Sequence, residues 1–245
     1  VPIENSLEGS INITLDLLAG PASDVQIVGE VLLRVSHSLI AAEAMDLAQI
    51  DTVLTHPQVP GQCTRFLHGE LSHAQILPAS STAEAVRSVV AEHRRGRAAL
   101  GTVLAARIYG GTVIREGVED RADNETRFVW LARTGADKSP PLRAVDCTPA
   151  PPWKTSLVFW GLGAERPGWL VRCLDEFARR QINLTKIESR PRRERLGSYM
   201  FFVDLGGCPE QGPVAEAISG VRELCEQVRV LGSYRAARAP ERRDS

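Results

Sequence analysis

The pattern of apolar and polar positions is clearest after residue 153. Between Gly168 and Arg180, residues Leu170, Cys173 and Phe177 recur on one face of a predicted helix. Apolar runs around it predict four strands and a second helix: strands at 155–160, 182–189, 199–205 and 228–231, and a helix at 214–226, with a charged turn at 192–197. The order β-α-β-β-α-β is that of a ferredoxin-like fold.

The first half of the chain alternates strand-like and helix-like stretches. Strand patterns cover 25–35, 52–54 and 126–131, and a small apolar run covers 98–106. From Ala83 to His93 the apolar residues return at helical spacing, behind the N-cap candidates Ser81 and Thr82. This alternation predicts an α/β unit with a largely parallel sheet, whose ligands sit where strands end and helices begin.

Residues 134–153 are rich in proline and show no sustained periodicity, which predicts an extended linker. We therefore expect four regions: a first domain at 1–134, a linker at 135–153, a second domain at 154–235 and a flexible polar tail at 236–245.

Composition narrows the classes of function. The chain has 245 residues, 43% of them hydrophobic, and its 29 basic and 30 acidic side chains nearly cancel. This balance gives no electrostatic reason to expect nucleic acid or a membrane surface as a partner, and no apolar run reaches the roughly 20 residues of a transmembrane helix. Five scattered cysteines predict buried thiols of a cytoplasmic protein.

Several common sites are disfavoured by spacing. Gly161 and Gly163 follow a predicted strand, but Arg166 stands where a dinucleotide-binding loop needs its third glycine. The five histidines lack metal-ligand spacing, and no G-x-S-x-G elbow indicates a serine hydrolase. These spacings favour neither a metal site nor a dinucleotide-binding site.

Four polar clusters lie at predicted strand–helix junctions, and each alone could be a helix cap or a turn. Together they offer neutral donors suited to an anionic small molecule. The clusters are 2–10 with 14–16, 55–58 with 62–63, 80–82, and 124–128.

These clusters carry a resemblance to the prephenate dehydratase family. That family's catalytic motifs resemble the string from Pro2 to Asp16, the segment Thr55-His56-Pro57-Gln58 with Gln62-Cys63, Ser81-Thr82-Ala83, and Asn124-x-Thr126-Arg127-Phe128. Segments 167–171 and 183–191 resemble the two phenylalanine-binding motifs of its C-terminal ACT domain. The resemblance implies a two-lobed catalytic domain like type II periplasmic binding proteins, followed by a ferredoxin-like ACT domain.

The resemblance implies decarboxylating dehydration of prephenate to phenylpyruvate without a cofactor. Thr126 would donate to the departing ring hydroxyl, although an ordinary alcohol is a weak acid and a relay from His56 or Glu4 is conceivable. Thr55 stands where the family usually has serine. The implied catalytic residues are Thr126, Arg127 and Phe128, and the implied substrate-binding residues are Asn5, Ser6, Thr55, Gln62, Ser81 and Thr82.

For regulation, the resemblance implies L-phenylalanine as an allosteric effector at a subunit interface of a homodimer or homotetramer. Trp169 stands where the family favours alanine, and it either faces the ligand or lies on the outer helix face. The implied effector-binding residues are Gly168, Trp169, Leu170, Val171, Asn183, Leu184, Glu188, Ser189, Arg190 and Pro191.

Other functions stay open. Family members begin some tens of residues earlier, so we expect the start of the catalytic domain to be missing. Arogenate dehydration is not separable from prephenate dehydration by any motif. A non-aromatising prephenate decarboxylase would not need the Thr126 hydroxyl. In another class, the chain could be a catalytically inactive phenylalanine sensor.

Overall fold

The computed structural model describes residues 1–135, 152–161, 163, 166–210 and 212–237. The chain divides into two compact units. Unit 1 comprises Val1–Leu33 and Thr126–Ser245, and unit 2 comprises Arg34–Glu125. No helix in the described ranges is long and apolar enough to cross a bilayer.

Unit 2 is built on a five-stranded sheet of order β6-β5-β7-β4-β8. The helix α2 (Thr64–Glu70) packs on one face through Phe66 and Leu67, and α3 (Thr82–Glu92) with α4 (Val103–Tyr109) packs on the other through Val86, Val89 and Ala105. The strands are β4 (Ser38–Ala41), β5 (Thr52–Thr55), β6 (Gln75–Pro78), β7 (Arg97–Gly101) and β8 (Thr112–Arg115), with 3-10 turns η1 (Leu47–Gln49) and η2 (Pro60–Gln62).

The expectation of a largely parallel sheet holds only for part of unit 2. Strand β5 is parallel to β6 and β7, whereas β4 is antiparallel to both β7 and β8. The helix α4 therefore connects two parallel strands, β7 and β8, as the local alternation predicts. Strand β4 comes from earlier in the chain and lies between them in the opposite direction, which local periodicity cannot reveal.

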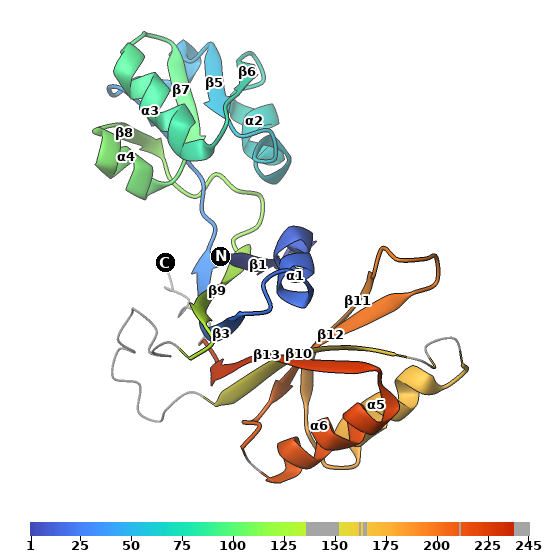
Figure 1. Cartoon of the computed structure of the whole chain (residues 1–245). Helices are drawn as coiled ribbons and strands as arrows, with labels where there is room; N and C mark the ends of the chain where they lie inside the picture. Colours follow the sequence, from blue (N-terminus) through green and yellow to red (C-terminus); the bar gives the residue numbers. More distant parts are fainter. Residues whose placement is uncertain (136–151, 162, 164–165, 211, 238–245) are drawn as a thin grey trace. The chain divides into compact units, whose positions relative to one another are not determined.

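The ferredoxin-like prediction is confirmed in unit 1. Its sheet has the order β11-β12-β10-β13 with antiparallel pairing of β12 to β10 and β11, and of β10 to β13. Both helices lie on one face of this sheet (Figure 1). The elements are β10 (Trp153–Trp160), α5 (Trp169–Ala178), β11 (Leu184–Pro191), β12 (Tyr199–Gly206), α6 (Gly212–Leu224) and β13 (Gln227–Arg235).

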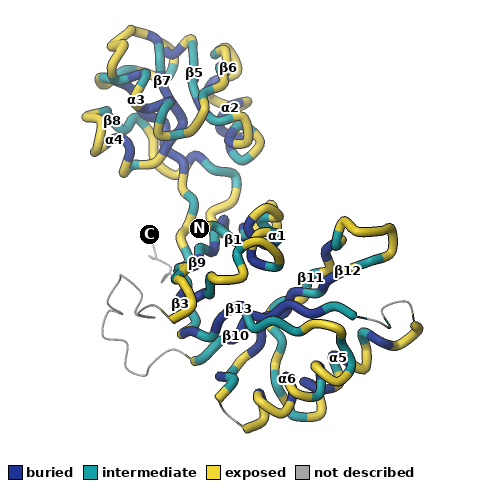
Figure 2. Tube along the Cα trace, viewed as in Figure 1, coloured by how far each residue is buried: buried dark blue, intermediate teal, exposed yellow. Residues whose placement is uncertain are grey.

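The other face of that sheet is covered by the N-terminal segment of the chain together with residues 125–133. Val158 and Phe202 pack with Ile3, Leu15 and Ile27 on this side, while Leu157 and Phe159 face the helices. Both faces of β10 are therefore buried, as the dark central strands of Figure 2 show. The covering elements are β1 (Pro2–Asn5), β2 (Gly9–Ser10), α1 (Asn12–Ala19), β3 (Val25–Arg34) and β9 (Glu125–Arg133), with a sheet order β2-β1-β9-β3.

Two glycines of unit 1 are required by close backbone approach, and a third by its positive φ. A Cβ on Gly232 of β13 would lie 2.1 Å from the carbonyl oxygen of Ile27, so β3 and the ferredoxin-like sheet touch backbone to backbone. A Cβ on Gly161 would lie 2.6 Å from the backbone nitrogen of Glu226, and Gly163 has a φ of +131°. The two glycines of the rejected nucleotide motif thus have a structural reason to be glycine.

The predicted linker and tail lie mostly outside the described residues, as does Cys147. The remaining cysteines are free, and all but Cys225 are buried. Burial, with Glu119 and Asp120 nearby, raises the pKa of Cys63 to about 12, so its thiol stays neutral. The prediction of buried thiols is confirmed for Cys63, Cys173 and Cys208.

Candidate active site and regulatory contacts

Thr126 and Asn5 form the centre of the catalytic motifs in unit 1. They are paired residues of the antiparallel strands β9 and β1, and Asn5 Nδ2 donates to Thr126 Oγ1 over 2.9 Å. The orientation of the Asn5 amide is fixed because its Oδ1 accepts from the backbone N–H groups of Leu7 and Glu8, each at 2.9 Å. Thr126 oxygen is therefore an acceptor from Asn5, and its own hydroxyl hydrogen is left to donate.

Arg127 lies on the opposite face of β9, because successive side chains of a strand point to opposite sides. Its guanidinium is buried at 7% exposure. Nε donates to Glu30 over 2.6 Å, Nη2 donates to the Tyr234 hydroxyl over 2.8 Å, and Nη1 contacts Asp204 and, at 3.4 Å, Glu4. Asp204 and Tyr234 belong to β12 and β13, so this side chain reaches the ferredoxin-like sheet.

The charges around Arg127 keep it protonated. Burial lowers its pKa, but the nearby Asp204, together with Tyr234 and Glu30, more than offsets this and raises the pKa above its ordinary value. Burial and Asp204 likewise raise the pKa of Tyr234 above the usual range. A guanidinium that cannot lose its proton is no proton source, so Arg127 offers charge and orientation only.

The remaining unit 1 residues of the catalytic set lie beside this pair. Phe128 is partly buried and pairs with Pro2 across the β1–β9 ladder. Ser6 is exposed in the turn that follows Asn5. Glu4, a candidate for the proton relay, contacts Arg127 and Lys186, each at 3.4 Å.

In unit 2, Gln62 belongs to a buried polar group that sequence reasoning missed in part. Gln62 Oε1 accepts from Asn124 Nδ2 over 3.2 Å and lies 3.0 Å from His37 Nε2. His37 is 5% exposed, and its Nδ1 has no hydrogen-bond partner among the described residues. Both groups donate to Oε1 when the histidine carries its proton on Nε2. No spacing rule connects His37 with Gln62.

Thr55 and Ser81 are both engaged locally. Thr55 ends β5, is 1% exposed, and donates its hydroxyl to the carbonyl oxygen of Leu100 over 3.1 Å. Ser81 is the N-cap of α3, as predicted, and accepts from the backbone nitrogen of Glu84 over 3.0 Å. Thr82 is the first residue of that helix. His56 is partly buried, and its Nδ1 accepts from the backbone of Gln58.

Trp169 takes a position that neither sequence alternative described. It is 3% exposed in the core between sheet and helices, with its ring centroid 6.0 Å from that of Phe159 and 5.9 Å from that of Phe201. Its indole nitrogen donates to the carbonyl oxygen of Leu224 over 2.8 Å. The two sequence alternatives, toward the ligand or on the outer helix face, are thus replaced by a core position at the start of α5.

Two of the predicted effector residues contact the N-terminal motif. Arg190 pairs with Asp16 at 2.8 Å and contacts Asn12, while Glu188 accepts from Ser10. Of the others, Gly168 caps α5 with a φ of +78°, Leu170 and Leu184 are partly buried, and Val171, Asn183, Ser189 and Pro191 are exposed. Towards the end of β11, Glu188 and Arg190 thus face the N-terminal motif, and the alternating residues Ser189 and Pro191 are exposed.

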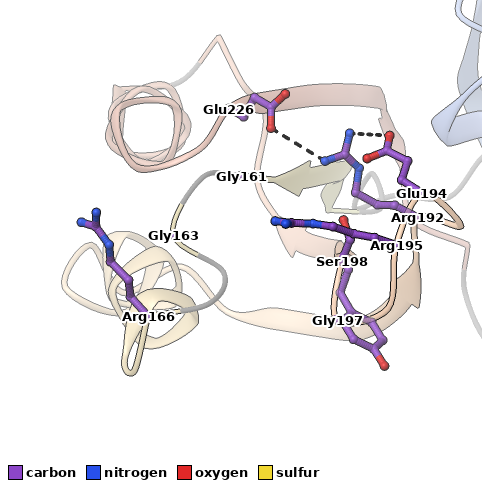
Figure 3. A pocket seen from close by; sticks show the side chains of 10 residues that line it. Gly161, Gly163, Arg166, Arg192, Glu194, Arg195, Gly197, Ser198 and Glu226 are labelled. Atoms are coloured by element: carbon purple, nitrogen blue, oxygen red, sulfur yellow. Dashed lines mark hydrogen bonds and ion pairs between the residues drawn. The ribbon is translucent and has the colours of Figure 1, made fainter.

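A cavity of about 420 Å³ lies in the ferredoxin-like domain (Figure 3). Arg192 contacts Glu194 at 2.8 Å and Glu226 at 3.7 Å within it, and Arg166 and Arg195 also line it. None of the predicted effector residues is among the described residues that line this cavity. No cluster of histidine, cysteine and carboxylate side chains suited to a metal ion occurs in the described ranges.

Comparison with known proteins decides the family. The family model described as prephenate dehydratase matches residues 1–136, and that of the ACT domain matches residues 162–223. The chain belongs to the prephenate dehydratase family. The ferredoxin-like part of unit 1 is its ACT domain.

Relatives and solved structures agree with this family assignment. A prephenate dehydratase of Mycolicibacterium vanbaalenii is 40% identical over 96% of this chain and 70% of its own length. A prephenate dehydratase of Methanocaldococcus jannaschii is 36% identical over 96% of this chain and 79% of its own length. The structure of the Arthrobacter aurescens prephenate dehydratase in complex with L-Phe has a TM-score of 0.79 and 34% identity, covering 96% of this chain and 74% of that one.

One solved structure of similar fold carries another activity in its name. It is described as a novel type of quorum quenching acylase, GqqA, with a TM-score of 0.80 and 31% identity over 96% of this chain and 81% of that one. A similar fold alone therefore does not establish which reaction a chain catalyses, and the activity has to be argued from the side chains of the site.

Proposed function

We propose that this chain is a cytoplasmic prephenate dehydratase, a hydro-lyase that converts prephenate to phenylpyruvate under feedback by L-phenylalanine. The observation that carries the proposal is the Asn5–Thr126 hydrogen bond, formed by two predicted site residues that are 121 positions apart in the chain. It lies in a chain whose residues 1–136 match the family model.

The reaction demands little chemistry from the protein. Prephenate loses its ring carboxylate as carbon dioxide and its ring hydroxyl as water, and aromatisation drives both losses. A donor aimed at the leaving oxygen stabilises the charge that develops there. Because Asn5 donates to the Thr126 oxygen, the Thr126 hydroxyl hydrogen is directed away from Asn5 and its O–H bond is polarised. Thr126 is thus suited to donate a hydrogen bond to that oxygen.

The other predicted residues would serve binding. Gln62 is held in a buried polar group with Asn124 and His37, and we propose that it contributes to binding a carboxylate of the substrate. Ser81 and Thr82 stand at the N-terminus of α3, where anions are favoured. Thr55 uses its hydroxyl hydrogen on Leu100, so we propose that it shapes the site and accepts rather than donates.

Regulation by L-phenylalanine is supported by the ACT domain and by the relative described in complex with L-Phe. A homodimer or homotetramer through the ACT domain is supported by the exposed apolar side chains Val171 and Ile187, at 68% and 49% exposure. Arogenate remains the alternative substrate, and the non-catalytic sensor remains the alternative of another class.

The mechanistic test is substitution of Thr126. Thr126→Ala should lower kcat for phenylpyruvate formation by about 100-fold or more, in the range for loss of one donor to developing charge. Thr126→Ser keeps the hydroxyl and should retain most of the activity. Thr134→Ala removes a hydroxyl just beyond the end of β9, which donates to the Asp24 carbonyl, and should leave kcat unchanged. Near-normal turnover in Thr126→Ala would remove Thr126 from the mechanism.

A further inference from the structure

The side chains of Arg127 and its neighbour Thr126 lie on opposite faces of β9. Thr126 faces Asn5, whereas Arg127 faces the ACT sheet, where it contacts Asp204 and Tyr234. A substrate held at the Thr126 hydroxyl would lie on the other face of the strand from the guanidinium. The catalytic role that the family resemblance implied for Arg127 is therefore better explained as an effect on Thr126.

The partners of Arg127 hold one another in place. Ser156 of β10 donates to Asp204 and lies 2.6 Å from the Tyr234 hydroxyl. Tyr234 is 1% exposed and Asp204 is 6% exposed. Three adjacent strands of the ACT sheet, β10, β12 and β13, thus contribute to a single buried network around one guanidinium. Such a network allows few alternative arrangements of its members.

The network also balances its charges on the side of the N-terminal segment. Glu30 of β3, whose side chain is 1% exposed, accepts from Arg127 and from Lys154, each at 2.6 Å. Two buried or nearly buried cations therefore meet two carboxylates, Glu30 and Asp204. Removing one partner would leave a buried charge without compensation, which is strongly destabilising. The guanidinium is therefore expected to move with the strands that carry its partners.

Apolar side chains would hold the two layers together at least as well as a buried ion pair does. Stability alone therefore does not explain why Arg127 has several specific acceptors. From this geometry we propose that Arg127 is a positioning residue that makes the Thr126 hydroxyl follow the arrangement of the ACT sheet. The inference rests on the proposed role of Thr126 in dehydration. It gives effector binding on the ACT domain a continuous physical connection to the catalytic hydroxyl, through one buried side chain on the adjacent residue.

The principal test removes a single oxygen from the ACT side of the network. Tyr234→Phe keeps the ring in the core and deletes the hydroxyl that accepts from Arg127. We expect kcat for prephenate to fall about tenfold, since displacing a catalytic group such as the Thr126 hydroxyl by about an ångström has an effect of that order or greater. The KM should stay unchanged, and a higher concentration of L-phenylalanine should be needed for half-inhibition. Tyr109→Phe, the same change on α4 of unit 2, is the matched control.

Two further variants separate positioning from simple stability. Asp204→Asn retains the shape of the side chain but removes its charge, and we expect a larger loss of kcat with the same weakening of inhibition. Arg127→Lys keeps the charge but has one ammonium in place of the fork that reaches Glu30, Asp204 and Tyr234, so it should not restore wild-type kcat. Variants with a lower melting temperature but wild-type kcat and wild-type inhibition would overturn the proposal.

A second measurement does not depend on the reaction. Hydrogen exchange of the β9 segment Glu125–Arg133 should be faster in Tyr234→Phe than in Tyr109→Phe, because Arg127 no longer holds the strand as firmly. Absence of prephenate turnover in the wild type would refute the proposed function alone. Unchanged exchange in β9 would refute the positioning role of Arg127, whatever the wild type catalyses.

Discussion

At the scale of single residues, the sequence motifs named candidate site residues but not what their side chains contact. Asn5 and Thr126 are brought together by the β1–β9 pairing, and Gln62 meets Asn124 inside unit 2. Their motifs could be read from the sequence because each contains several polar residues in a fixed order. His37 could not, because a lone histidine has no spacing signal and its contact with Gln62 exists only after folding.

Gln62 allows a prediction about substrate binding. Gln62→Glu keeps an oxygen for Asn124 and His37 but replaces the neutral amide by a carboxylate that repels a dianion. We expect the KM for prephenate to rise about tenfold or more, since a hydrogen bond to a charged group contributes about 1.5–3 kcal/mol. Gln58→Glu makes the same change at an exposed position of the same loop and should leave the KM nearly unchanged. Equal KM values in steady-state kinetics of the two variants would contradict a binding role for Gln62.

At the scale of elements, most helices and strands followed from periodicity because each buries one face. The predicted helix from residue 83 is α3 at Thr82–Glu92, and the predicted ferredoxin-like order is that of β10 to β13. The direction of β4 was not predictable, because it depends on strands far away in the sequence. Trp169 shows the same limit: helical spacing places it near the start of α5, but only packing shows that its ring fills the core.

The core position of Trp169 makes a prediction about the ACT domain. Trp169→Ala should lower the free energy of unfolding by about 3–5 kcal/mol, as expected when a buried aromatic side chain is truncated. Trp169→Phe loses mainly the hydrogen bond to Leu224 and should cost about 1 kcal/mol. Urea unfolding followed by circular dichroism measures both. Trp153→Ala, at a partly exposed ring beside Arg235, is the control and should cost less than Trp169→Ala. Equal losses in Trp169→Ala and Trp153→Ala would contradict the core position.

At the scale of the whole molecule, the ACT sheet is covered on both faces, which the sequence indicated only in part. The run Leu157-Val158-Phe159 is apolar at every position, which is typical of a strand covered on both faces. Helices α5 and α6 cover one face, and the N-terminal segment with Arg127 covers the other. The sequence therefore held a signal that something packs there, but not that the catalytic motif itself does so. The predicted boundary at 135–153 lies mostly outside the described residues and stays a prediction.

The most direct measurement of the central claim is turnover of prephenate by the purified chain, with phenylpyruvate and carbon dioxide quantified together. The account predicts one phenylpyruvate for each carbon dioxide released, and a rate that falls when L-phenylalanine is added. Carbon dioxide without phenylpyruvate would instead indicate a non-aromatising decarboxylase. No turnover of prephenate, alongside measurable binding of L-phenylalanine, would contradict the account and favour a sensor.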